Sequence, residues 1–442
     1  MNKLIIPEKV EFLLNRLHSN NYQAYIVGGC VRDLVMGLEP NDYDITTSAT
    51  PQQVHDVFND LHIIDTGIKH GTVTVMVDKE PYEITTYRSD SSYSDHRHPD
   101  KVTYSSDLQE DLVRRDFTIN AMAYNAESGL VDLFGGINDI SNKIVRCVGD
   151  PNRRFDEDAL RILRCIRFAG RLGFEIEEQT QKALFSNSHL LDYVSRERIM
   201  SELSQILCNE NLEPVLQKYR DIFACIIPEI RIMFDYDQHS VYHAYDLWTH
   251  TVKVTAYVRN YLPLRLAALL HDIGKPESAV ADEKGHLHFH GHQDISARMA
   301  ETILRRLKCS NALINEVVML IKNHDRRLYS EKALRKALYV MGSKEKMYDL
   351  LELIEADNQA KSEQTRYMYG DLYYKTLVDL IYSKDARILS LRDLSINGDD
   401  LIALGLTGQR IGKALQKALN GVIEGQVDND RNELLKYLGL SD

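Results

Sequence analysis

Asp42 and Asp44 are the residues whose spacing most strongly suggests chemistry in this chain of 442 residues. They follow a β-rich run that ends in Gly28-Gly29, and they stand at the start of another predicted strand. Because alternate residues of a strand project to the same face, the two carboxylates can lie side by side. Such a pair suits two Mg²⁺ ions about 3.5–4 Å apart, which stabilise the attacking and leaving oxygens in phosphoryl transfer.

Neighbouring residues can complete this site. Gly28 and Gly29 let the backbone approach phosphate oxygens, and Arg32 stands where a following helical turn could bind the same phosphates. Glu83 is the candidate for a third carboxylate, which would orient or deprotonate an attacking hydroxyl. An outward-facing strand position is an equally good interpretation of Glu83, because glutamates are usually exposed.

A second polar set lies at Arg114, Arg115, Asp116 and Asn120. Two guanidinium groups can hold a triphosphate, while a carboxylate and an amide can hydrogen-bond to ribose hydroxyls. The same residues could equally form surface ion pairs. The residue types alone therefore leave a ribonucleotide site and an ion-pair network as alternatives.

The segment 153–171 has the period of a helix, with apolar residues on one face and arginines on the other. Its six arginines and three acidic residues give it a charge of +3. Asp158 and Arg161 are three residues apart, so we expect them to be neighbours on a helix. The pair offers an acceptor and a donor that match cytosine and adenine, whereas uracil and guanine reverse both groups. A solvated arginine face is the plainer alternative.

Three segments together resemble a known family. The sequences of 27–54, 112–125 and 153–174 are similar to motifs of the class II tRNA nucleotidyltransferases, the CCA-adding enzymes of the polymerase β superfamily. The resemblance implies an α+β fold, in which a polymerase β-type nucleotidyltransferase α/β head is followed by an all-helical neck, HD module and tail. It also implies that CCA is added to the 3′ end of tRNA from CTP and ATP, without a template and with Mg²⁺ as cofactor.

The resemblance also implies roles for single residues. Asp42 and Asp44 would bind Mg²⁺, and the set at 114–120 would select the ribose. Asp158 and Arg161 would read the base. Two further arginines of the same segment would support nucleotide phosphates or the template helix, namely Arg164 and Arg167. The polar stretch 89–106 resembles the flexible loop of the full CCA-adding type, with Tyr93, Asp95, His96, Arg97, His98 and Pro99.

The resemblance over roughly residues 20–210 leaves alternatives open. A relative that adds only CC, only A or a poly(A) tail would share the same motifs. A different class is an HD-type metal phosphohydrolase whose head merely binds RNA. The paired metal carboxylates argue against that class, because a head that only binds has no need of them.

Histidines are concentrated in the middle of the chain, where nine of the sixteen lie between His239 and His324. His250, His271-Asp272 and Asp325 follow in the order of an HD-type phosphohydrolase, and we expect them to hold a second divalent metal. Such ligands, gathered from several helices, would activate water on a phosphate ester. Three further histidines could complete a second metal position, namely His288, His290 and His292. A purely structural module is the alternative.

Four segments must position these residues: an α/β head at 1–150, a helical neck at 151–235, an HD metal-binding domain at 236–335 and a helical tRNA-binding tail at 336–442. A helix is predicted at 10–17, and strands are predicted at 24–27, 43–47, 72–77 and 82–87. Near the C-terminus, Gly408 and Gly412 flank a helix start that could hold RNA phosphates or serve only for packing.

Composition limits the class of protein. The chain has 53 Lys+Arg against 65 Asp+Glu, a net charge of −12, and 44% hydrophobic residues, as in globular proteins of about three domains. This balance argues against coating of nucleic acid by bulk charge, but it leaves room for a local basic surface. We expect a cytoplasmic protein without membrane spans, disulfides or a thiolate zinc site. The sequence does not specify the oligomeric state.

Overall fold

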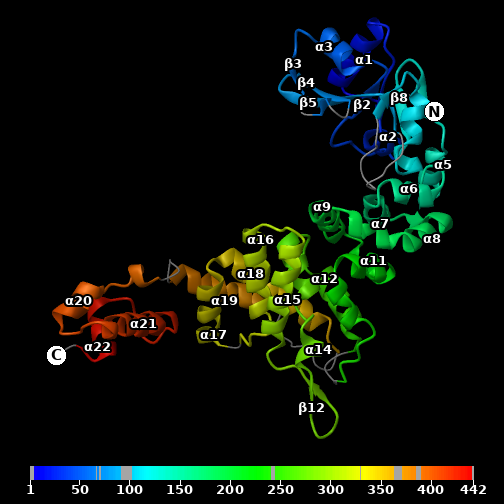
Figure 1. Ribbon diagram of the computed structural model, residues 1–442. Coiled ribbons are helices and arrows are strands. Elements are labelled where there is room, and N and C mark those ends of the chain that lie inside the picture. Colours follow the sequence, from blue (N-terminus) through cyan, green and yellow to red (C-terminus); the bar gives the residue numbers. More distant parts are fainter. Residues whose placement is uncertain are drawn as a thin grey trace. The chain divides into compact units, whose positions relative to one another are not determined.

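The computed structural model describes residues 4–65, 67–68, 71–90, 102–239, 244–328, 330–362, 371–384 and 390–440. The chain divides into two compact units, residues 1–228 and 229–442. Figure 1 shows that a sheet with its flanking helices begins the first unit and that the second unit is almost entirely helical. The mixed α+β class predicted from the sequence is thereby confirmed, while the finer division into four segments stays a prediction.

Within the described residues, seven strands form the sheet of the first unit, in the order β3-β4-β5-β2-β1-β8-β9. Their bounds are β1 (Ala24–Val27), β2 (Ile45–Thr47), β3 (His62–Ile64), β4 (Thr72–Val77), β5 (Glu80–Thr86), β8 (Met122–Asn125) and β9 (Gly129–Asp132). β2 and β5 run parallel, and the other neighbours are antiparallel. β2 begins at Ile45, so the two aspartates lie just before the strand rather than in it.

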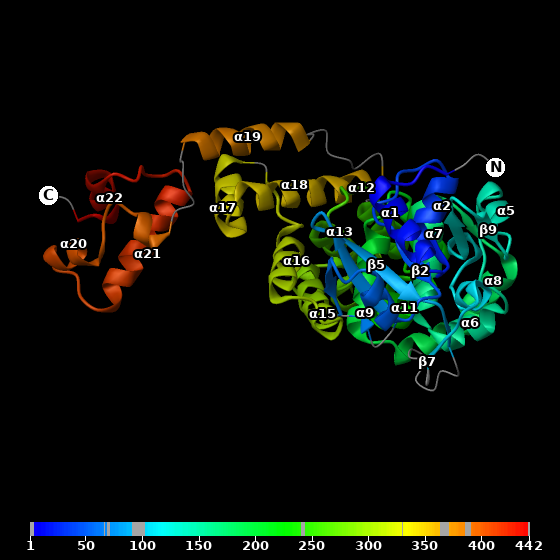
Figure 2. The ribbon, with the colours of Figure 1, turned by 90° about the horizontal axis from the view of Figure 1, so that it is seen from above.

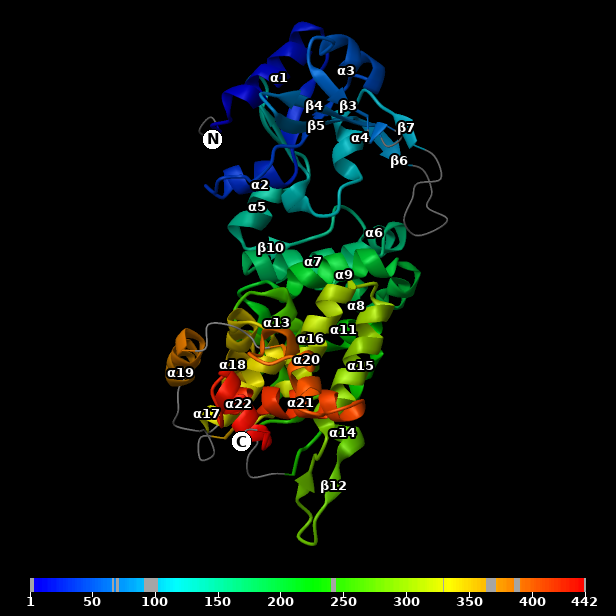
Figure 3. The same cartoon turned by 90° about the vertical axis from the view of Figure 1, so that its left-hand side faces the viewer.

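Helices cover both faces of this sheet, as Figure 3 shows. On one face, α1 (Glu8–Ser19) and α3 (Pro51–Val57) pack against apolar strand residues that include Ile45 and Ile84. On the other face, α4 (Leu108–Val113) packs against Tyr25, Val27 and Tyr87. Side chains alternate between the faces, so the residues before Ile45 and Ile84 point toward the α4 side.

Short helical elements follow two strands of the sheet. α2 (Gly29–Val35) starts directly after β1, and η2 (Thr118–Asn120) lies against α5 (Gly136–Ser141). The Thr118 hydroxyl donates to the buried Asp139 carboxylate at 2.6 Å. The hairpin β6 (Arg88–Asp90) and β7 (Val102–Tyr104) brackets the polar loop, whose six expected residues lie outside the described part of the chain.

The rest of the first unit is helical, apart from the two-residue pair β10 (Ile144–Val145) and β11 (Glu175–Ile176). Its helices are α6 (Pro151–Glu157), α7 (Leu160–Leu172), α8 (Glu178–Ser186), η3 (Ser188–Tyr193), α9 (Arg196–Leu207), α10 (Leu212–Lys218) and α11 (Arg220–Ile226). α7 packs along α9. The segment 153–171, expected to be helical throughout, is therefore divided by a break between α6 and α7.

The second unit is a helical bundle with a small hairpin. Its elements are η4 (Pro228–Met233), α12 (Leu247–Tyr257), α13 (Leu262–Leu270), α14 (Lys275–Ser278), β12 (Val280–Ala281), β13 (Leu287–His288), α15 (His292–Arg306), α16 (Asn311–Asn323), α17 (Glu331–Met341), α18 (Lys344–Gln359), α19 (Asp371–Lys384), η5 (Leu391–Asp393), α20 (Gly398–Ala403), α21 (Gln409–Ile423) and α22 (Arg431–Leu438). α15 and α16 lie side by side (Figure 2). The last three helices share a small apolar core of their own.

Two expectations from composition can be compared with this fold. All six cysteines lie in the described residues, and none of them forms a disulfide. Among the helices of the described part of the chain, none combines the length and apolar character that a bilayer-spanning segment needs. The expected cytoplasmic location stays a prediction.

Gly136 packs so closely against η2 that a Cβ there would lie 2.4 Å from the Thr118 carbonyl oxygen. Gly136→Ala should lower the free energy of unfolding of the first unit by about 1–3 kcal/mol, since α5 must move away from η2. Calorimetric unfolding measures this loss. Gly29→Ala is the matched control in α2, because its Cβ would meet only Arg32 at 3.7 Å. Equal melting of the two variants would contradict the packing argument.

Candidate active site and a buried histidine-aspartate cluster

Three acidic residues lie near the point where β2 and β5 begin to pair, namely Asp42, Asp44 and Glu83. The parallel register matches Ile45 with Ile84, so Asp44 and Glu83, the residues just before them, are neighbours. Partial desolvation raises the pKa of Asp44, and the carboxylates of Asp42 and Glu83 raise it further. Crowded like charges of this kind are relieved by a cation, and carboxylate oxygens are ligands that Mg²⁺ prefers. The donor chemistry of this set therefore suits a divalent metal, although the three carboxylates are not among the groups of described residues whose ligand atoms all lie within 4.8 Å of one another.

An arginine lies between these carboxylates and the glycine turn. Gly28 has a φ of 84°, and a Cβ there would stand 3.2 Å from Arg115 Nη1. The positive charge of Arg115 opposes part of the rise in the pKa of Asp44, so the guanidinium lies near that carboxylate. Gly28 thus serves both the left-handed turn and the close approach of a cation. A cation beside a turn that starts a helix can bind the phosphates of a nucleotide.

Asp111 of α4 holds that arginine in place. Its fully buried carboxylate accepts from Arg115 Nη2 at 3.1 Å and from Arg114 Nη2 at 2.6 Å. The Thr46 hydroxyl donates to the same carboxylate at 3.2 Å. Sequence analysis missed Asp111, although its spacing of three and four residues from the two arginines on a helix was a usable signal.

The predicted ribose set forms a buried chain of hydrogen bonds. Arg164 donates to Asp116 Oδ2 through Nε at 2.9 Å and through Nη2 at 2.6 Å. Asn120 donates to Asp116 Oδ1 at 3.3 Å and accepts from Arg32 Nη1 at 2.8 Å. Arg32 is only 3% exposed, and it also donates to Asp33 at 2.8 Å. In this structure Arg32 therefore organises the amide of Asn120, and its expected contact with phosphates stays a prediction.

Asp158 lies just before α7 instead of within it, which corrects the expectation that it and Arg161 belong to one helix, although the Asp158 carbonyl accepts the Arg161 N–H at 3.0 Å. Asp158 is extended, with φ −148° and ψ 101°, and its carboxylate accepts the Leu160 N–H at 3.2 Å. This local hydrogen bond competes with a continuous helix and favours the break. Arg161 donates instead to Glu157 at 2.8 Å and to the Arg114 carbonyl at 3.0 Å.

Arg167 of α7 is covered by acidic and polar residues of α9, whereas Arg171 at the end of the same helix is exposed. Arg167 is 8% exposed, with Nε 2.8 Å from Glu202 and Nη1 donating to Gln205 at 2.6 Å. Arg198 donates both of its Nη groups to Asp158, at 3.2 and 2.8 Å. Sequence analysis missed Arg198 and Glu202, because their pairing depends on how two helices dock.

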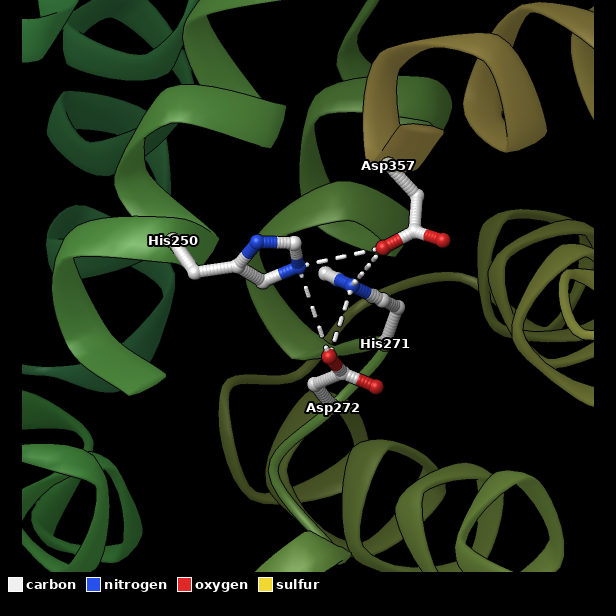
Figure 4. A group of neighbouring side chains, drawn as sticks. All are labelled: His250, His271, Asp272 and Asp357. Carbon is white, nitrogen blue, oxygen red and sulfur yellow. Dashed lines mark hydrogen bonds and ion pairs between the residues drawn. The ribbon is translucent and has the colours of Figure 1, made fainter. Parts of the chain in front are cut away.

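A second cluster lies in the core of the helical unit, where His250 of α12 and Asp357 of α18 approach His271 and Asp272 (Figure 4). His250 Nε2 is 3.0 Å from Asp357 Oδ1, and His271 Nε2 is 3.1 Å from Asp272 Oδ2. Potential ligand atoms of all four residues lie within 4.8 Å of one another. The two histidines and Asp272 are buried to 99% or more.

Asp272 also joins a second group with two histidines. Its Oδ1 is 3.2 Å from His292 Nε2 and 3.6 Å from His324 Nε2. The Nδ1 of His271, His292 and His324 each contacts a backbone carbonyl at 2.7 Å, so each Nδ1 must carry the hydrogen. In the neutral rings the Nε2 lone pairs then point inward, as in metal-binding histidines.

This arrangement corrects the expected ligand set. Asp325 is exposed and lies in neither group, because it follows His324 at the end of α16 and turns toward solvent. Asp357, which sequence analysis missed, takes its place from α18. Of the three further histidines, only His292 joins a group, whereas the exposed His288 and His290 stack on each other at 5.8 Å.

Lysines balance the charge of the cluster. Lys275 Nζ is 2.6 Å from Asp272 Oδ2, and Lys361 Nζ is 2.7 Å from Asp357 Oδ2. Burial lowers the pKa of His250, which favours its neutral ring. Burial also opposes charge on His271, but the adjacent Asp272 outweighs this effect and raises the pKa of His271 to about 9.

Comparison with known families gives matches in three parts of the chain. The model of the poly A polymerase head domain matches residues 24–146. The model described as "Probable RNA and SrmB- binding site of polymerase A" matches 173–233. The model of tRNA nucleotidyltransferase domain 2 matches 283–438.

Relatives match over nearly the whole length. A CCA-adding enzyme of Lactobacillus delbrueckii subsp. bulgaricus is 33% identical over 431 residues, which are 97% of this chain and 96% of that protein. A CCA-adding enzyme of Bacillus velezensis is 32% identical over 96% of both chains. The crystal structure of the Bacillus stearothermophilus CCA-adding enzyme in complex with CTP has a TM-score of 0.75, at 27% identity and 98% coverage of both chains.

The ion pairs of the buried Asp111 should make the free energy of unfolding depend on pH. Burial alone would raise the pKa of Asp111, but Arg115 and Arg114 lower it below its ordinary value. A lowered pKa contributes stability above about pH 4, and this contribution is lost as the pH falls through the folded-state pKa. At pH 7, Asp111→Asn should therefore lower the free energy of unfolding by about 1.5–3 kcal/mol.

Calorimetric or denaturant unfolding from pH 7 to pH 3 measures this effect. The difference between Asp111→Asn and the wild type should shrink as the pH falls below about 4, because the carboxylate of the unfolded wild type takes up a proton there before that of the folded protein does. Glu110→Gln, at an exposed position of the same helix, is the control and should change stability little. A difference that is constant across this pH range would contradict the role assigned to the ion pairs.

Proposed function

Because this chain belongs to the CCA-adding enzymes, we propose that it adds CCA to the 3′ end of tRNA from CTP and ATP and releases pyrophosphate. The observation that supports the proposal is that Glu83 and Arg115 both influence the charge of Asp44, while Arg115 lies against the Gly28 turn. The tRNA 3′-hydroxyl oxygen bonds to the α-phosphorus of the nucleotide, and the bond from that phosphorus to the pyrophosphate oxygen breaks. No nucleic-acid template is required.

Asp42 and Asp44 would hold the divalent metal, which we propose to be Mg²⁺. When bound, the metal supplies a Lewis acid for the phosphoryl group and for the leaving pyrophosphate. Glu83 lies next to Asp44, so it can orient the 3′-hydroxyl and accept its proton. Arg115, held by Asp111, would bind the phosphates on the side of Gly28.

Ribose and base recognition would fall to the polar chain along α7. Asp116 and Asn120 are fixed by Arg164 and Arg32, so they present defined groups to ribose hydroxyls. Asp158 and Arg161 would pair with the amine and ring nitrogen that cytosine and adenine share. Uracil and guanine would place a carbonyl against the carboxylate, which is repulsive.

Asp42→Ala tests the proposed chemistry. Loss of a metal-binding carboxylate should reduce both C and A addition about a thousandfold, roughly 4 kcal/mol of transition-state stabilisation, while tRNA binding persists. The assay uses labelled CTP or ATP with tRNA lacking CCA, ending in C or ending in CC, so it also separates full from partial addition. Glu39→Gln removes an exposed charge from the same loop and should stay active. An active Asp42→Ala protein would refute the assignment.

We also propose that the histidine-aspartate cluster binds a divalent metal. The grouping of buried ligand atoms carries this proposal, since His250, His271, Asp272 and Asp357 place potential ligand atoms within 4.8 Å of one another. Imidazole and carboxylate ligands suit zinc, manganese or iron. When bound, such a metal supplies an activated water for attack on a phosphate ester, as the order of motifs predicts.

Asp357→Ala should lower the affinity for Mn²⁺ or Zn²⁺ more than about tenfold, because it removes a ligand of the first group. Metal content after dialysis and titration calorimetry of the full-length protein measure the change. Asp325→Ala is the matched control, as it alters an exposed aspartate outside both groups. Equal loss of metal in the two variants would reject Asp357 as a ligand.

A further inference from the structure

Asp158 is held by an arginine from another helix. Arg198, on α9, donates through Nη1 to Asp158 Oδ1 at 3.2 Å and through Nη2 to Oδ2 at 2.8 Å. Two parallel N–H donors fix both the position and the plane of a carboxylate, which a single charge cannot do. The Asp158 side chain is 18% exposed and that of Arg198 is 25% exposed, so the pair is partly shielded from water.

This pairing limits what Asp158 can still bind. A carboxylate offers about four acceptor positions, and Arg198 fills one on each oxygen. The Leu160 N–H at 3.2 Å fills a second position on Oδ1. Among the described residues, one acceptor position is therefore left, on Oδ2. A carboxylate restrained in this way can accept a single N–H of a base, from one direction.

Arg161 is restrained in a complementary way. Its Nη1 donates to the Arg154 carbonyl at 3.1 Å and to Glu157 at 2.8 Å, which uses both hydrogens of that nitrogen. Its Nη2 donates one hydrogen to the Arg114 carbonyl at 3.0 Å. Within the described part of the chain, Nε–H and one Nη2 hydrogen remain, so the guanidinium can act on a base only as a donor.

We propose that Arg198 is a positioning residue that determines base selectivity, because it keeps the Asp158 carboxylate in the one orientation that accepts an exocyclic amine. This inference rests on the proposed base-reading role of Asp158. Without Arg198, the carboxylate is free to rotate away from the carbonyl of uracil or guanine. A variant without Arg198 should therefore accept UTP and GTP more readily, while its binding of CTP and ATP changes less.

The test compares Arg198→Met with the wild-type full-length protein. The readout is the ratio of kcat/KM for CTP to that for UTP, measured on tRNA lacking CCA. The ratio for ATP to GTP is measured on tRNA ending in CC. Both ratios should fall roughly tenfold to a hundredfold, as expected when a directed base contact is lost. A ratio is independent of the fraction of active protein, so partial unfolding does not imitate the effect.

Arg196→Met is the matched control. Arg196 lies on the same helix and is 31% exposed, but it faces Asp192 at 3.7 Å instead of Asp158. Its selectivity ratios should equal those of the wild type. Arg198→Lys keeps the charge but loses the two parallel donors, so it should lower the ratios as well. Wild-type ratios in the lysine variant would overturn the inference.

Asp158→Asn distinguishes base reading by Asp158 from positioning of that carboxylate by Arg198. If Asp158→Asn lowers the ratios but Arg198→Met does not, the role of Arg198 is overturned while base reading by Asp158 stands. If Asp158→Asn leaves the ratios unchanged, the proposed base reading fails, and the inference fails with it. If both act, adding Arg198→Met to Asp158→Asn should lower the ratios no further, because Arg198 acts only through Asp158.

Discussion

Ion pairing around α7 is the constraint on which the first unit depends. Arg164, whose side chain is 35% exposed, joins the buried Asp116, and the buried Arg167 joins the buried Glu202 of α9. A buried charge without its partner costs several kcal/mol, so each pair requires its elements to dock correctly. The segment around Asp116 and the helices α7 and α9 are consequently held in one arrangement by the same few charged groups.

Local patterns predicted the elements better than the contacts between them. Alternating apolar residues placed β4 at 72–77 as observed, and the strand predicted at 43–47 overlaps β2, which begins at Ile45 just after the two aspartates. The break at Asp158 was not predicted, because the arginine and apolar faces continue across it and conceal a single extended residue. Helical spacing therefore misjudged the local geometry at Asp158, while the base-reading role of Asp158 and Arg161 stays a prediction.

Long-range partners were beyond the sequence for a physical reason. Asp357 reaches His250 from a helix more than a hundred positions later, and nothing in the local pattern around either residue indicates this meeting. Asp325 stood beside a histidine that does point inward, yet adjacent helical residues project in different directions. Packing of α12 against α18, and not the order of motifs, selects which carboxylate enters the cluster.

The extended residue between α6 and α7 affects how this region responds to evolution and to engineering. Asp158 is the extended residue between the two helices, and its carboxylate accepts the Leu160 N–H. The same side chain therefore stabilises the helix break and supplies the carboxylate that we propose to read the base. Alanine, the strongest helix former, would favour fusion of the two helices and would swing α7 relative to its neighbours. Alanine scanning here would thus confuse a change of shape with a loss of charge, and only near-isosteric replacements report on the carboxylate itself.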